Sequence, residues 1–247
     1  MIWPFNLFSK TIPMPTSPTP SPAPKGAVQV DRIAGKPVRR IAGTPTVFWK
    51  SGMTVDGDGS PRCYHPNRAS GLDRLANAGG PGDWYGVATD NDKPSGKQVI
   101  QGPDDPAPGF YISTTALQDS TKKVLDTARY VNSEKIPYSV LPENIQCNGR
   151  MGDFGTVINL NNGRVCHIVW ADVGPHDEIG EGSIYLAKQI GVNPDCRKGG
   201  APDGILFILH EGSRLGPSII PTLTEINTIA GGHFSRLDLD FIKKTVS

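Results

Sequence analysis

The stretch CHIVWADVGPHDEIGEGSIYLAKQIG, residues 166–191, carries the strongest structural signal in this chain. Its first six residues are mostly apolar and predict a buried strand that ends at Asp172. Gly174-Pro175 predicts a reversal, because glycine permits unusual dihedral angles and proline restricts its own. Ser183 is a typical helix N-cap, so a helix is expected over 184–190. The local prediction is therefore a strand, a turn and a helix.

Two acids in this stretch, Asp172 and Glu181, suggest a chemical role. We interpret Asp172 as closing the strand and Glu181 as opening the helix, so that the turn aims both side chains at one point. Hydrolysis of a glycosidic bond needs such a pair, because one carboxylic acid protonates the leaving oxygen while a carboxylate activates water. In inverting enzymes the two groups stand roughly 6.5 to 9.5 Å apart. The alternative is that Asp172 merely begins a turn and that Glu181 is an acid of the kind favoured near a helix N-terminus.

Further motifs surround this pair. They are Asp-Val-Gly-Pro at 172–175, Ile-Gly-Glu-Gly-Ser at 179–183, Ile-Gly at 190–191, Gly-Gly at 199–200, Ile-Pro-Tyr-Ser-Val-Leu-Pro at 136–142, Gly-Asp at 152–153, and the segment 50–59 with its Asp-Gly-Asp-Gly turn. Together they resemble the fungal chitosanase family, glycoside hydrolase family 75, or a bacterial or phage relative of it. The resemblance spans roughly Val47 to Ser213, and residues 61–119 are longer and richer in Gly, Pro and Asp than that family leads us to expect.

The resemblance implies an endo-acting, inverting hydrolase of a β-1,4-linked amino-sugar polymer, with Asp172 and Glu181 as its catalytic acids. It favours Glu181 as the proton donor and Asp172 as the base. Physical arguments are divided, because a helix N-terminus lowers the pKa of Glu181 whereas desolvation raises it. The residues expected to bind substrate are Lys50, Asp56, Asp58, Asp153 and Ser183.

The rest of the chain predicts a mainly β fold. Short strands are expected at 46–50, 98–101, 110–113, 139–141, 156–160, 164–170 and 205–210, and a second helix at 218–229. By analogy with other polysaccharide hydrolases, we expect a compact six-stranded barrel of the double-psi kind, with few helices and long Gly/Pro-rich loops. Trp84, Tyr85, Phe110 and Tyr111 lie in such loops and are candidates to line a sugar-binding cleft, whereas Trp170 is expected in the core.

The chain divides into a tail and one domain. Residues 1–27 are rich in proline and predict a flexible segment, and residues 28–247 predict a single catalytic domain whose extension, 214–247, packs on the barrel. The first eight residues are too short and too broken by proline for a membrane span or a standard export signal. Since a wall polymer lies outside the cytoplasm, we expect a site of action outside the cell, in the periplasm or at the cell wall. Without a standard signal the protein would reach it by another route, with a possible delivery partner for the tail.

Charge and composition leave the substrate open. A net charge of +1 and a pI near 7.7 give no basic stripe for nucleic acid and no overall acidic field for chitosan. A peptidoglycan muramidase, delivered as a phage lysin or a secreted antibacterial effector, fits the charge about as well. A non-catalytic carbohydrate-binding barrel is the third candidate. Neither a metal site nor a cofactor is expected, since the histidines and cysteines lack ligand spacing.

Four cysteines allow three pairings. Cys147 and Cys166 flank a predicted hairpin and are the favoured pair. Free buried thiols are an equal alternative, because a free cysteine behaves as a small apolar residue.

Overall fold

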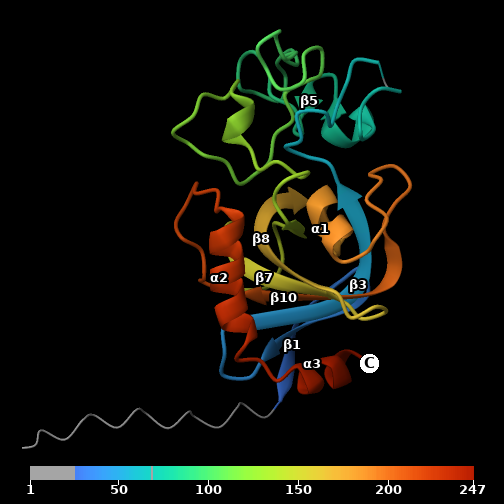
Figure 1. Ribbon diagram of the computed structural model, residues 1–247, viewed down its shortest axis with the longest axis vertical. Coiled ribbons are helices and arrows are strands. Elements are labelled where there is room, and N and C mark those ends of the chain that lie inside the picture. The colour runs from blue at the N-terminus through green and yellow to red at the C-terminus, as the bar shows by residue number, and fades with distance from the viewer. Residues whose placement is uncertain (1–25, 68) are drawn as a thin grey trace, which may run out of the picture.

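Six strands close into a β barrel in the computed structural model, which describes residues 26–67 and 69–247 (Figure 1). They are β3 (Thr46–Asp56), β6 (Tyr138–Pro142), β7 (Phe154–Asn159), β8 (Val165–Gly174), β9 (Glu181–Ser183) and β10 (Ala201–His210). Their order is β3-β10-β7-β8-β6-β9, and the pairing of β9 with β3 closes the ring. The pairs β3–β9 and β6–β8 are parallel and the others antiparallel. The predicted compact six-stranded barrel is confirmed.

Two further strands extend the barrel sheet beyond β3. The strands β1 (Ala27–Ile33) and β2 (Lys36–Ile41) form an antiparallel hairpin, and β2 continues the sheet by pairing with β3. Sequence reasoning placed the start of the domain here without predicting these strands. Apart from residues 26 and 27, the predicted flexible segment lies outside the described residues.

The barrel interior is filled by side chains from alternate positions of its strands. The indole of Trp49 on β3 stacks on the ring of Phe207 on β10, with ring centroids 5.3 Å apart. Trp170 is also buried in this cluster, as predicted. Since these side chains occupy the interior, a ligand must be bound at the rim of the barrel and not inside it.

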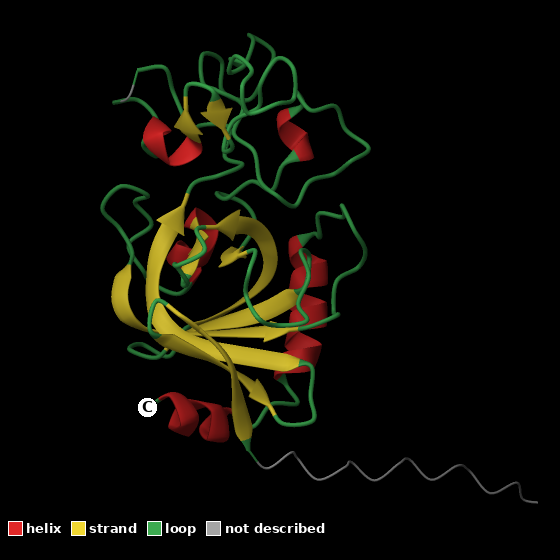
Figure 2. Ribbon diagram, turned by 180° about the vertical axis from the view of Figure 1, so that it is seen from behind, coloured by secondary structure: helices red, strands yellow, loops and turns green. Residues whose placement is uncertain are grey.

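Two helices near the C-terminus cover the outside of the barrel (Figure 2). In α2 (Leu223–Phe234), Ile226 and Ala230 pack on buried residues of β7 and β8. In α3 (Leu239–Val246), Ile242 packs against the β3 and β10 residues Phe48 and Leu206. The extension therefore packs on the barrel as expected. Among the described residues, no helix is long and apolar enough to cross a membrane.

The segment 57–131, here called the cap, lies beyond one end of the barrel (Figure 1). It consists mostly of loops, with the short elements η1 (Leu75–Ala78), β4 (Gly79–Gly80), β5 (Asp83–Trp84) and η2 (Thr127–Arg129). Small apolar clusters of its own hold it together. The strands predicted at 98–101 and 110–113 are wrong, since these segments make only isolated bridges such as Ile100 with Tyr111. Glycines and prolines on both sides prevent longer ladders.

Two other boundaries differ from the sequence prediction. The helix expected at 218–229 begins at Leu223, because Ser218 has a left-handed φ of 58° and Thr222 forms a capping box with Glu225. Helix α1 (Ile184–Gln189) has Ser183 as its N-cap, as predicted. Glu181, however, does not open this helix, because it is the first residue of the separate strand β9.

Candidate active site

Strand ends at the rim of the barrel carry the predicted acids toward the cap. Asp56 is the last residue of β3, Asp172 lies near the end of β8, and Glu181 begins β9. Because β9 pairs with both β3 and β6, Glu181 lies beside Thr54 and Val140. Asp172 and Glu181 both line one cavity, which has a volume of about 900 Å³. The structure thus brings the two predicted catalytic residues together.

The two glycines that flank Glu181 allow three strand segments to meet at this point. A Cβ on Gly180, whose φ is +103°, would lie 2.4 Å from the carbonyl oxygen of Gly52. A Cβ on Gly182 would lie 2.9 Å from the carbonyl oxygen of Tyr138. Larger residues would therefore push β9 away from its neighbours and displace Glu181.

Backbone groups hold one oxygen of Asp172 in place. Its Oδ1 accepts hydrogen bonds from the amides of Val173 at 2.8 Å and of Ala116, in the cap, at 3.0 Å. Its Oδ2 is buried and has no hydrogen-bond partner among the described residues. The side chain is therefore fixed through one oxygen, while the other has an unused capacity to accept a hydrogen bond.

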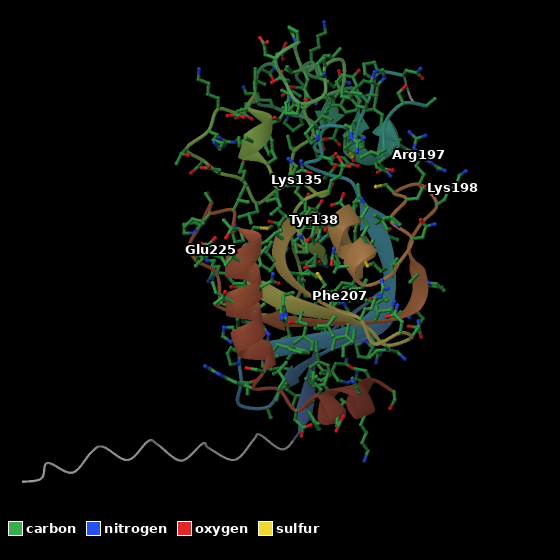
Figure 3. The ribbon with its side chains drawn as sticks, viewed as in Figure 1. Lys135, Tyr138, Arg197, Lys198, Phe207 and Glu225 are labelled. Carbon is green, nitrogen blue, oxygen red and sulfur yellow. The ribbon has the colours of Figure 1, made fainter. Side chains whose placement is uncertain are left out.

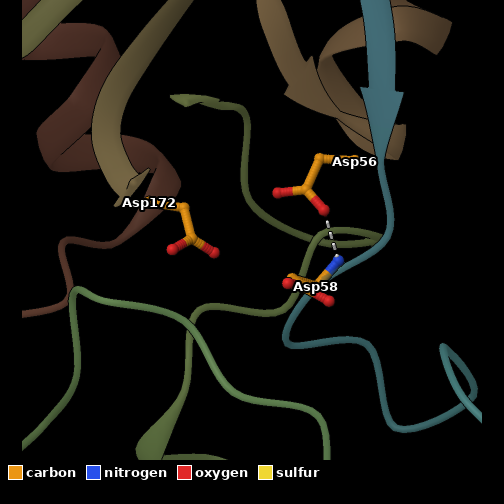
Figure 4. Close-up of side chains that lie close together, drawn as sticks. All are labelled: Asp56, Asp58 and Asp172. Atoms are coloured by element: carbon orange, nitrogen blue, oxygen red, sulfur yellow. Dashed lines mark hydrogen bonds between the residues drawn. The ribbon is translucent and has the colours of Figure 1, made fainter. Parts of the chain in front are cut away.

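Asp56 and Asp58 lie beside Asp172 and are linked to each other (Figure 4). The Oδ1 of Asp56 accepts from the amide of Asp58 at 2.8 Å. The Tyr138 hydroxyl lies 2.9 Å from both Asp56 Oδ2 and the carbonyl oxygen of Asp58. Figure 3 shows Tyr138 where the barrel meets the cap. Within the cap, Ser113 donates to Asp58 Oδ1 at 3.1 Å. The bond from the Tyr138 hydroxyl on β6 to the carbonyl oxygen of Asp58 joins the barrel to the cap.

Burial raises the pKa values of all four carboxyls at the cavity, Asp56, Asp58, Asp172 and Glu181. Burial, together with the charge of Asp73, raises the pKa of Asp56 to about 6. The pKa of Asp58 is well above its usual range because of burial and the charges of Asp56 and Asp172. Burial and the charge of Asp56 likewise raise the pKa of Asp172. For Glu181 the pKa is raised by burial and then by the charges of Asp56 and Asp172. The site therefore retains protons at a pH where exposed carboxyls have lost theirs.

The four acids nevertheless differ in the groups around them. The two amides that donate to Asp172 oppose the rise of its pKa, because they stabilise its charged form. The pKa of Glu181 is raised by Glu178 and Asp73 in addition to the two aspartates. Glu181 lies in β9 and not in the first turn of α1, and burial has the largest influence on its pKa. The two carboxyls of the pair thus differ, because amide donors favour the ionised form of Asp172 whereas acidic neighbours disfavour the ionised form of Glu181.

Three of the predicted substrate-binding residues lie away from the cavity lining. Lys50 is partly exposed, with its Nζ 3.8 Å from Asp203 Oδ2. Ser183 is buried, and its Oγ accepts from the amides of Tyr138 and Leu186. Asp153 is fully buried, and its carboxylate accepts from the backbone amides of Arg150, Gly212 and Arg214. Ser183 thus stabilises the start of a helix, and Asp153 holds two loops. Asp56 and Asp58 line the cavity, so they are placed where a substrate could reach them.

Several further residues belong to the lining, and the sequence did not identify Tyr64 and Tyr130 among them. Asp73, Asp92, Lys93 and Glu178 all contribute to it, as do the aromatic residues Tyr64, Trp84, Tyr85 and Tyr130. Trp84 and Tyr85 were predicted, whereas Phe110 and Tyr111 are not part of the lining. Because the cap is made of irregular loops, no periodic pattern indicated which of its side chains face the barrel.

The acids could hold a cation as well as protons. Asp56, Asp58 and Asp172 each offer a carboxylate oxygen, and these atoms lie within 4.8 Å of one another. Oxygen ligands of this kind suit hard divalent cations. The sequence did not predict this grouping, because Asp172 comes from a different part of the chain than Asp56 and Asp58.

A second, smaller cavity adjoins the first. Its volume is about 330 Å³, and Glu181, Gly174, Thr54 and Val140 line both cavities. The far side is more apolar, with Met53, Leu141, Pro142 and Ile179 among its residues. The accessible space therefore continues on both sides of Glu181, as a groove for an extended ligand would.

Comparison with known proteins adds no assignment, since neither the models of known protein families nor the curated proteins give a match to this chain.

Proposed function

We propose that this protein is an endo-acting glycoside hydrolase that cleaves β-1,4 bonds of a chitosan-like amino-sugar polysaccharide by inversion. Two carboxyl groups at one cavity, Asp172 and Glu181, support the reaction type. The motifs that resemble glycoside hydrolase family 75 point to the same pair. Its site of action would be outside the cell, in the periplasm or at the cell wall.

The observation that carries the choice of substrate is the charge of the cavity lining. The lining residues include seven acids, Asp56, Asp58, Asp73, Asp92, Asp172, Glu178 and Glu181, and one cation, Lys93. The whole chain is nearly balanced, with 25 basic and 24 acidic residues. Acidic groups are thus concentrated at the cavity, where they attract the ammonium groups of a deacetylated polymer.

The same charge distribution disfavours the muramidase alternative. Peptidoglycan carries carboxylate groups on its peptide stems, and these would be repelled by an acidic cavity. A carbohydrate-binding barrel without activity would not benefit from several buried carboxyls with raised pKa values, since perturbed pKa values are typical of catalytic sites. The groove on both sides of Glu181 supports cleavage within a polymer and not only at its end.

In the proposed mechanism Glu181 donates its proton to the glycosidic oxygen. Burial and neighbouring negative charges keep this carboxyl protonated before substrate arrives. The carboxylate of Asp172, which lines the cavity, accepts a hydrogen bond from water and takes its proton as the water oxygen attacks the anomeric carbon. The glycosidic bond breaks, the leaving sugar keeps the proton of Glu181, and the new reducing end has the inverted configuration.

The test compares purified wild type with Asp172→Asn and Glu181→Gln on chitosan oligomers and on purified peptidoglycan. Each substitution should lower kcat on chitosan by roughly 10² to 10⁴ fold, the range for loss of one acid or base. Asp83→Asn, at an exposed cap residue outside the cavity lining, is the matched control. NMR of fresh products should show the α-anomer first.

Four results would contradict the proposal in whole or in part. Turnover that survives both substitutions removes the enzyme assignment. Turnover of peptidoglycan without turnover of chitosan favours the muramidase, and binding of either polymer without turnover favours the carbohydrate-binding barrel. Retention of configuration would overturn the inverting mechanism alone.

A further inference from the structure

Two cysteines from distant parts of the chain meet at the glycine that follows Asp56. A Cβ on Gly57 would lie 2.7 Å from Cys63 Sγ and 3.1 Å from Cys196 Sγ. Both sulfurs are therefore close to one point and hence to each other. Cys63 belongs to the cap, whereas Cys196 lies in the loop between α1 and β10. This pairing differs from the predicted one of Cys147 with Cys166, and all four cysteines are free thiols in the structure.

Other contacts hold the two segments together at this place. The guanidinium of Arg197, next to Cys196, donates through Nη2 to the carbonyl oxygens of Gly71 at 2.7 Å and Asp73 at 3.1 Å. Figure 3 shows Arg197 on its loop next to the cap. Asp195 Oδ1 accepts from the amides of Arg197 and Lys198, which stiffens the loop itself. The cysteines are thus brought together by a built contact between the cap and the barrel.

The two thiols differ in their access to solvent. Cys63 is fully buried, whereas Cys196 is partly exposed and belongs to the cavity lining. An oxidant can therefore reach Cys196 through the cavity, and Cys63 lies where it can complete the reaction. A disulfide bond needs the sulfurs about 2.05 Å apart, so small side-chain rotations accompany bond formation.

We propose that Cys63 and Cys196 form a disulfide bond that ties the cap to the barrel at the edge of the substrate cavity. The oxidant is a small-molecule disulfide such as oxidised glutathione. The Cys196 thiolate, after loss of a proton, attacks this disulfide and releases one thiolate of glutathione. The Cys63 thiolate then attacks the mixed disulfide and releases the second. Two protein thiols are oxidised, and one glutathione disulfide is reduced to two thiols.

The surroundings indicate when this bond forms. Burial and the charges of Asp58, Asp56 and Asp73 raise the pKa of Cys63. Burial and the charges of Asp73 and Asp56 also raise the pKa of Cys196. Because the thiolate is the attacking species, exchange in the folded protein is slow, and the bond is expected to form during folding.

The experiment refolds the full chain in a buffer of oxidised and reduced glutathione, blocks free thiols and digests with trypsin. Cleavage after lysine and arginine gives one cysteine peptide of residues 63–68 and another of residues 189–197. Mass spectrometry should find these two joined, and a reductant should separate them. Reduction should lower the Tm by about 4 to 16 °C, as expected for loss of one disulfide in a chain of this size.

Variants make the assignment specific. Cys196→Ser should abolish the effect of reductant on Tm, and Cys63→Ser should do the same if its buried site tolerates the change. Cys147→Ser is the matched control and should keep both the joined peptide and the effect. Blocked thiols at both Cys63 and Cys196 after oxidative refolding would overturn the proposal, and so would a joined peptide that links Cys147 to Cys166. These readouts do not depend on glycosidase activity.

Discussion

Replacing Asp56 with asparagine should stabilise the protein at neutral pH, because this buried carboxyl must lose a proton there. Burial raises the pKa of Asp56 from its ordinary 3.8 to about 6 in the folded state. A group whose folded pKa is raised contributes stability that is fully present below the unfolded pKa and is lost as the pH rises through the folded pKa. The wild type therefore loses stability between about pH 4 and pH 6, and the loss is complete near pH 7.

The magnitude follows from the size of the shift. A difference of about two pKa units corresponds to about 3 kcal/mol of unfolding free energy at pH 7. An asparagine keeps the hydrogen-bond pattern, because its Oδ1 can accept from the amide of Asp58. Its Nδ2 can donate to the hydroxyl of Tyr138, which then donates to the carbonyl oxygen of Asp58. The substitution therefore removes a charge without leaving a buried polar group unpaired.

Urea unfolding at pH 4 and pH 7 measures the effect. Asp56→Asn and wild type should have similar unfolding free energies at pH 4, and the variant should be more stable by about 3 kcal/mol at pH 7. In thermal unfolding this corresponds to a rise in Tm of about 6 to 12 °C. Asp83→Asn, at an exposed position, should show no such pH-dependent gain. A stability difference that stays constant between pH 4 and pH 7 would refute the reasoning.

Three other perturbations test separate features. Glu178→Gln should shift the alkaline limb of the pH profile of kcat/KM to lower pH, because the charge of Glu178 raises the pKa of Glu181. Glu181 must be protonated to act, so an unchanged limb would contradict this role. Asp153→Ala leaves three backbone amides without their acceptor and should cost about 3 kcal/mol or more in denaturant unfolding. Ile242→Ala should cost about 2 to 5 kcal/mol if α3 is part of the cooperative fold, and a smaller loss would mean that α3 frays independently.

Local signals were sufficient to predict much of the barrel. The segment of β8 and the N-cap of α1 at Ser183 were predicted correctly. An apolar run and a capping residue determine the structure of residues only a few positions away in the sequence. Strand β9 was missed because three residues carry no periodicity. Its extended form depends on pairing with β3 and β6, which come from distant parts of the chain.

The candidate site was predictable only in part for a similar reason. Asp172 and Glu181 were found from a nearby turn, and Asp56 and Asp58 from another. Asp73 and Glu178 join them only because the cap and the turn fold over the rim of the barrel. Asp153 shows the opposite error, since a motif next to a hairpin suggested a substrate contact while its carboxylate serves three backbone amides. Motif position alone did not distinguish a binding carboxyl from an anchoring one.

The concentration of buried acids is unfavourable for the free protein, and the proposed substrate explains why it would be retained. Burial, and then like charges at the cavity, raise the pKa values of Asp56, Asp58, Asp172 and Glu181, so each ionisation costs free energy in the absence of a counter-charge. An ammonium group of the substrate near Asp56 and Asp58 would favour their ionised form. Asp172 keeps its two amide donors and can ionise with them, while Glu181 lacks equivalent compensation and retains its proton. Substrate binding would thus supply the charge that the empty site lacks and separate the roles of the two catalytic carboxyls.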